Sequence, residues 1–123
     1  MNVPRIFESE YRFCLILWDN EPVNSTKLVE LCREHLGWSK ATTYTVIRRL
    51  SERGVVKNEN ATVTALVSKE QAQQARLTEM VEETFEGSMP AFIAAFADGG
   101  NLTEHDISEI RKMIDSYEGG RRK

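Results

Sequence analysis

Residues 39–54 constrain the fold of this chain most. Their sequence, SKATTYTVIRRLSERG, contains signals for the start and end of a helix and separates apolar from polar side chains with the period of a helix. Ser39 is a good helix N-cap, since its hydroxyl can accept a hydrogen bond from a backbone N–H of the first turn. Gly54 can adopt the left-handed conformation that ends helices. Between them lies a mostly apolar stripe with the period of a helix: Thr43, Val46, Ile47 and Leu50. We therefore predict a helix that packs one face against a core.

The other face of this predicted helix combines short hydroxyl side chains with guanidinium groups. It carries Thr42, Thr45, Arg48, Arg49 and Glu52, with Lys40 and Ala41 at its leading end. Hydroxyl and guanidinium groups hydrogen-bond to the edges of bases and to phosphates. The face is therefore typical of a DNA recognition helix, and a basic face that is simply solvated is the alternative.

Basic residues are concentrated on this helix and just after it. The whole chain has 16 Lys and Arg against 19 Asp and Glu, a formal net charge of −3. Residues 39–57 hold five basic residues and one acid, a local charge of +4. Because salt screens charges beyond about 8 Å at physiological ionic strength, this local charge matters more for DNA binding than the total. The side chains that we expect to contact DNA are Ser39, Lys40, Thr42, Thr45, Arg48, Arg49, Arg53 and Lys57.

Two helices are predicted before this segment. The first covers residues 8–19 and is strongly apolar. The second begins at a cap supplied by Asn24 or Ser25 and runs to about Leu36, where Gly37 ends it. A short glycine-containing turn thus joins the second helix to the basic one, which indicates a helix-turn-helix arrangement.

A small β-hairpin is predicted after the basic helix. Residues 55–57 and 62–67 are rich in β-branched side chains, and the segment 58–61 between them is turn-forming. This hairpin would be the wing of a winged helix-turn-helix domain over residues 1–68. Lys57 is its only basic residue, so the wing either grips phosphate or only braces the recognition helix.

The remainder of the chain, residues 69–123, is predicted to be helical. Ser68 and Gln71 form a capping box that opens the first of three amphipathic helices, at residues 69–86, 89–97 and 104–117. Helices this short cannot bury their apolar stripes on one another alone, so we expect a dimerisation region, with packing onto the winged helix as the alternative. The predicted fold is therefore mainly α with a small β wing. The residues expected at the dimer interface are Leu77, Val81, Phe85, Phe92, Phe96, Ile107, Ile110 and Ile114.

The composition argues against several other classes of protein. No apolar run reaches the roughly 18 residues of a membrane-spanning helix and the N-terminus is no signal peptide, so we expect a cytoplasmic protein without membrane insertion. Cys14 and Cys32 lie in apolar helical contexts without a Cys/His cluster, which predicts buried thiols and neither a metal nor another cofactor. A redox-sensing pair is the alternative. His35 and His105 have no nucleophile or paired carboxylates at a catalytic spacing, so we expect no enzyme.

The order and spacing of these elements resemble the repressors of the penicillinase and methicillin-resistance family (BlaI/MecI/CopY type) over nearly the whole chain. The resemblance rests on an apolar first helix that ends in Trp18, on Trp38 and Ser39 before the recognition helix, and on Leu102 and Thr103 before the last helix. It also rests on residues within and after the recognition helix, namely Thr42, Thr45, Arg49, Leu50 and Gly54.

The resemblance implies a homodimeric transcriptional repressor whose two winged helices occupy the halves of a palindromic operator in double-stranded DNA. It implies that the side chains at Lys40, Thr42, Thr45 and Arg49 approach bases and the phosphate backbone. A winged-helix adapter that docks on another protein and does not bind DNA is the alternative function.

The chain departs from the family pattern in three places. It has no C-terminal cysteine, which disfavours the copper sensing of some members. Ala95 and Phe96 stand where β-lactam-responsive members have a cleaved Asn-Phe bond, which leaves cleavage by a membrane sensor-protease open beside a small ligand in the dimer seam. The wing reads Asn58, Glu59 and Asn60 where the family commonly has arginine and an aromatic residue, which implies a weak grip on DNA.

Overall fold

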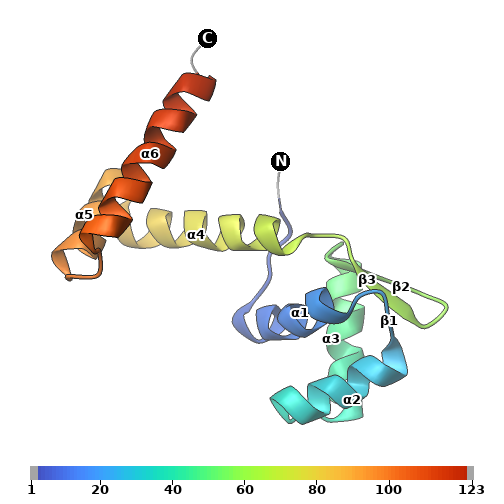
Figure 1. Ribbon diagram of the computed structural model, residues 1–123. Helices are drawn as coiled ribbons and strands as arrows, with labels where there is room; N and C mark the ends of the chain where they lie inside the picture. Colours follow the sequence, from blue (N-terminus) through green and yellow to red (C-terminus); the bar gives the residue numbers. More distant parts are fainter. Residues whose placement is uncertain (1–2, 122–123) are drawn as a thin grey trace. The chain divides into compact units, whose positions relative to one another are not determined.

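Within residues 3–121, helices α1, α2 and α3 and a small sheet come first along the chain, and helices α4, α5 and α6 follow (Figure 1). The computed structural model describes residues 3–121, with side chains as far as residue 117. The first elements are α1 at Glu8–Asn20, β1 at Val23–Asn24, α2 at Ser25–Leu36, α3 at Lys40–Glu52, β2 at Val56–Glu59 and β3 at Thr62–Ala65. They are followed by α4 at Lys69–Phe85, α5 at Met89–Asp98 and α6 at Glu104–Arg121. This mainly helical fold with a small wing confirms the predicted fold class.

The chain divides into two compact units, Met1–Leu77 and Thr78–Lys123. The division falls inside α4, whereas the sequence-based boundary lies at the capping box before that helix. Ser68 Oγ accepts a hydrogen bond from the Gln71 backbone N–H at 3.0 Å, and Gln71 Oε1 accepts one from the Ser68 N–H at 2.9 Å. The capping box therefore opens α4 as predicted, and the first turns of this helix belong to the winged-helix unit.

Local capping sets the ends of the helices around the turn before α3. The Asn24 side chain accepts a hydrogen bond from the Thr26 N–H at 2.8 Å, so Asn24 caps α2. Gly37 adopts a φ of 70° at the end of α2, a left-handed conformation that costs glycine little. Ser39 then caps α3 by accepting from the Thr42 N–H at 3.1 Å. These predicted stop and start signals place α2 and α3 as a helix-turn-helix pair.

The sheet has three antiparallel strands in the order β1-β3-β2. Strands β2 and β3 form the predicted hairpin, with Val56 opposite Ala65 and Glu59 opposite Thr62. Strand β1 was not predicted, because two residues show no alternation and the pairing of Val23 with Val63 joins positions 40 residues apart. This extra strand attaches the wing to the chain just before α2.

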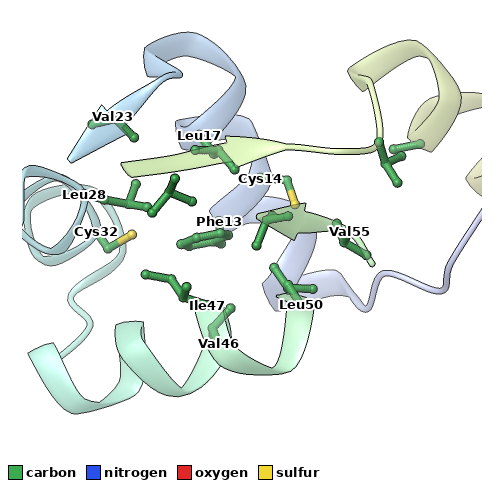
Figure 2. Packing of buried hydrophobic residues seen from close by; sticks show 14 residues of the cluster. Phe13, Cys14, Leu17, Val23, Leu28, Cys32, Val46, Ile47, Leu50 and Val55 are labelled. Carbon is green, nitrogen blue, oxygen red and sulfur yellow. The ribbon is translucent and has the colours of Figure 1, made fainter. Parts of the chain in front are cut away.

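One hydrophobic core holds α1, α2, α3 and the wing together (Figure 2). Phe13 and Leu17 of α1 are fully buried at its centre, and the ring of Phe13 stacks on Trp38 at a centroid distance of 6.2 Å. The rest of the core comes from each neighbouring element and includes Leu28, Cys32, Ile47, Leu50, Val55, Val56 and Val63. Because Ile47 and Leu50 point into this core, the opposite face of α3 points away from it.

The first two turns of α4 are attached to α1. Ala72 is buried in the same core, and the Trp18 indole N–H donates to the Val67 carbonyl at 2.9 Å just before the helix. Arg76 donates to Glu8 Oε1 at 2.8 Å, and its guanidinium lies 3.8 Å from the centre of the Tyr11 ring. These contacts explain why the first unit extends to residue 77.

The second unit contains the end of α4 together with α5 and α6. Ser88 caps α5 by accepting from the Ala91 N–H at 3.1 Å, and Thr103 with Asp106 forms a reciprocal cap at the start of α6. The rings of Phe85 and Phe92 meet edge to face at 5.7 Å. Helix α6 runs to Arg121, four residues beyond the predicted end. No helix in residues 3–121 is long and apolar enough to cross a membrane.

Candidate nucleic-acid interface

The outer face of α3 carries most of the predicted DNA-contacting residues at the surface. Its inner face is fixed by burial of Thr43, Val46, Ile47 and Leu50. Ser39, Lys40, Thr42, Arg48 and Arg49 are exposed, and Thr45 is half-buried between them and the core. The helix therefore presents hydroxyl and cationic groups on one surface, as the sequence pattern predicts.

The hydroxyls at the start of α3 are ordered by capping. Ser39 Oγ accepts from the Thr42 N–H and donates its own proton to Thr42 Oγ1 at 3.0 Å. The Thr43 hydroxyl donates to the Ser39 carbonyl at 3.1 Å and is buried. Because Thr42 Oγ1 already accepts a hydrogen bond, its proton is available to donate to an acceptor outside the protein. The first turn thus offers an oriented hydroxyl donor.

Three cations on this surface have no partner among the residues that the structure describes. The side chains of Lys40, Arg48 and Arg49 make no ion pair and no hydrogen bond with any residue that the structure describes. A cation that is not engaged within the protein can bind phosphate without breaking an existing contact. Lys40 also lies at the helix N-terminus, where free backbone N–H groups attract anions.

Arg53, one of the side chains predicted to contact DNA, has its guanidinium turned to the protein. Its Nη2 donates to Glu10 Oε2, and its Nη1 donates to the Arg5 carbonyl at 2.8 Å. The Glu10 side chain is 8% exposed and the Arg53 side chain 29%. The guanidinium also lies 5.3 Å from the centre of the Phe7 ring. We call this group of Arg5, Phe7, Glu10 and Arg53 the α3 clamp, because it ties the end of α3 to the segment before α1.

Lys57, the basic residue of the wing, is also paired. Its Nζ lies 3.4 Å from Glu59 Oε1, and both side chains are at least half exposed. Asn58 and Asn60 are exposed beside them. Of the five basic residues in the +4 segment, two are thus engaged by acids.

Two residues of this region, Glu10 and Tyr44, make side-chain hydrogen bonds that the sequence analysis did not predict. Glu10 Oε1 accepts from the Phe7 N–H at 2.9 Å, and Glu10 Oε2 binds Arg53. The Tyr44 hydroxyl donates to Ser25 Oγ at 3.2 Å and so joins α3 to the first residue of α2. Glu10 and Arg53 are 43 positions apart and Ser25 and Tyr44 are 19 apart, so neither contact produces a periodic pattern in the sequence.

The predicted dimerisation residues fall into two groups. Val81 is buried, and Phe85, Phe92 and Ile110 are half-buried, so part of the apolar stripe finds cover within the chain. Leu77, Phe96, Ile107 and Ile114 are exposed, together with further apolar side chains of α4–α6, namely Met80, Met89, Ile93, Met113 and Tyr117. Ala95 and Phe96, the residues at which the sequence analysis left cleavage open, are both exposed on α5.

The two cysteines are buried and unpaired, as predicted. Desolvation by burial raises the pKa of Cys14 to about 12, and desolvation raises that of Cys32 to about 11. Both thiols are therefore protonated and unreactive at neutral pH. Within the described residues, no three His, Cys, Asp or Glu side chains form a group that could hold a metal ion.

Comparison with known proteins matches residues 6–116 to the penicillinase repressor family. The methicillin resistance regulatory protein MecI of Staphylococcus aureus is 21% identical over 113 residues, which cover 89% of this chain and 92% of that protein. An uncharacterized 16.5 kDa protein in the ptsI 3′ region of Latilactobacillus sakei is 26% identical over 117 residues, which cover 92% of this chain and 80% of that protein. The match includes the winged helix and nearly all of the C-terminal helices.

Proposed function

Because the chain belongs to the penicillinase repressor family, whose members are DNA-binding transcriptional repressors, we propose that it acts as a homodimer on a pseudo-palindromic operator. The observation that carries this proposal is the outer face of α3, where three unpaired cations flank exposed hydroxyls. A winged helix inserts such a face into the major groove.

Each side chain of the α3 face has a distinct role in the proposal. Thr42 and Thr45, about one turn apart, offer a hydroxyl to a base edge and a methyl group to thymine. Arg49 reaches a guanine edge or a phosphate one turn further on. Lys40 and Arg48 bind phosphate and set the position of the helix on the duplex. Arg53 has no direct contact with DNA in this proposal, because the α3 clamp holds its guanidinium.

The exposed apolar side chains of α4–α6 support the dimer. Leu77, Ile107 and Ile114 are exposed in the single chain although each lies on an amphipathic stripe. Large exposed apolar surfaces mark interfaces, and a second copy with the same stripes would cover them. Two-fold symmetry then places the two α3 helices in major grooves about one helical turn apart, roughly 34–36 Å.

Selection of bound sequences from a randomised duplex library tests the proposal at physiological salt. The expected product is a two-fold sequence with half-sites about one turn apart, bound by two chains per duplex. A failure to enrich any sequence would favour the adapter function.

We also propose that the repressor is released by cleavage between Ala95 and Phe96. The support is the exposure of both residues on α5, in a helix without a buried residue. Mass spectrometry after co-expression with a sensor-protease encoded nearby tests this step. An intact chain under inducing conditions would leave a small ligand in the dimer seam as the signal.

A further inference from the structure

The wing carries only two charges, and they neutralise each other. Residues 55–67 contain Lys57 and Glu59 and no other charged side chain. Since they are two apart on β2, both side chains lie on the same face of the strand. Their cross-strand neighbours on β3 are the uncharged Thr64 and Thr62. No other charge on the hairpin competes with this pair.

The Lys57–Glu59 contact is well placed to be exchanged for a contact with DNA. The Nζ and Oε1 atoms are 3.4 Å apart, and the side chains are 50% and 70% exposed. An exposed pair of this kind contributes little to folding, because water and salt screen it. Strand β2 follows α3 after a short turn, in which the Val55 N–H donates to the Leu50 carbonyl at 2.8 Å, so the wing is fixed to the end of the proposed recognition helix.

We propose that Glu59 is an internal competitor for DNA phosphate at Lys57, and that it limits the affinity of the wing for DNA. In this arrangement the ammonium group must leave Glu59 before it binds a phosphate, and the carboxylate then faces the phosphate backbone without a partner. The inference rests on the proposed function and names a residue that limits the affinity of the protein for DNA. Of the two roles of the wing, it favours bracing α3, since Glu59 weakens the grip of Lys57 on phosphate.

This competition acts on the part of binding that does not depend on sequence. Contacts to phosphate supply nearly all of non-specific affinity, whereas contacts to base edges supply discrimination. Removal of the competitor should therefore strengthen binding to operator and to unrelated DNA by the same factor. The electrically neutral wing would thus keep the repressor from being held at unrelated sites.

Glu59→Gln tests the inference in the full-length chain, with the duplex obtained by selection and a scrambled duplex as probes. The expected result is a roughly two- to fivefold tighter Kd for both duplexes, from the range of exposed ion pairs. The slope of log K against log salt should steepen by about 0.9, for one phosphate newly neutralised. The same substitution in a Lys57→Ala background is the matched control, and the gain should disappear there.

Each other outcome has a defined meaning. If the unmodified protein binds the selected duplex and Glu59→Gln changes neither Kd nor salt slope, the inference is wrong while the proposed function stands. A gain that persists in the Lys57→Ala background would also overturn it, because the effect would then come from the acidic charge alone. If the unmodified protein binds no duplex, the proposed function fails and the inference fails with it.

Discussion

Replacing Arg53 by alanine should destabilise the winged helix without removing a contact with DNA. The substitution deletes two hydrogen bonds, to Glu10 and to the Arg5 carbonyl, and the contact with the Phe7 ring. It leaves the Glu10 carboxylate, 8% exposed, with the Phe7 N–H as its remaining partner in the clamp.

The expected loss follows from the burial of the carboxylate. Removing one partner of a buried ion pair costs about 3–5 kcal/mol, because the other charge stays buried and unpaired. The Arg53 side chain is 29% exposed, so water can reach part of the gap, and we expect about 2–4 kcal/mol in the free energy of unfolding. By contrast, Arg49→Ala removes an exposed, unpaired side chain and should change stability by less than about 0.5 kcal/mol.

Urea unfolding followed by circular dichroism measures both variants, at a fixed protein concentration because dimerisation adds to apparent stability. A Glu10→Gln, Arg53→Met double variant is the control, and it should lose less than Arg53→Ala, since it leaves no buried charge without a partner. If Arg53→Ala unfolds at the same urea concentration as the unmodified protein and instead weakens DNA binding as Arg49→Ala does, the clamp does not have the role assigned to it.

Two further predictions concern the second unit and the core. Ile114→Asp should convert the protein from dimer to monomer in sedimentation at micromolar concentration. The Ile114 side chain is 54% exposed in the single chain, and the substitution would put a charge into the apolar interface that it is proposed to form. His105→Asp on the same helix is the control and should stay dimeric. A monomeric unmodified protein would contradict the proposed interface. Cys14 and Cys32 should resist thiol reagents at pH 8 until the protein unfolds, and rapid labelling of the native state would refute their burial. Because folding raises both pKa values, the thiols favour the folded state below the ordinary pKa of about 9, and this contribution is lost as the pH rises towards 11–12.

The elements that local chemistry determines could be predicted from the sequence. Asn24, Gly37 and Ser39 set helix ends through hydrogen bonds or backbone angles within a few residues. The inner face of α3 was also predictable, because burial follows the helical period. The exposed face of α3 could then be predicted too, because it consists of the residues that lie opposite the buried ones.

The partners of individual charges could not be predicted in the same way. Arg53 looks in the sequence like Arg49, but it meets Glu10 because α1 and the end of α3 lie together in the fold. Strand β1 likewise exists only because Val23 reaches Val63. The Lys57–Glu59 pair is the exception, since two residues on one strand face have a spacing that the sequence reveals. Phe85, expected at the dimer interface, gains cover from the Phe92 ring of α5, a contact between two helices that the sequence pattern does not reveal.

The most direct test of the account is the ratio of Kd values for a selected operator and for the same duplex with mismatched half-sites, measured at physiological salt. We expect Thr45→Ala and Arg49→Ala to lose roughly 1–3 kcal/mol on the operator and to lower this ratio. Lys40→Ala should weaken binding to both duplexes alike and reduce the salt slope by about 0.9. If Thr45→Ala and Arg49→Ala both leave operator affinity and the ratio unchanged, α3 does not read DNA and the central claim is contradicted.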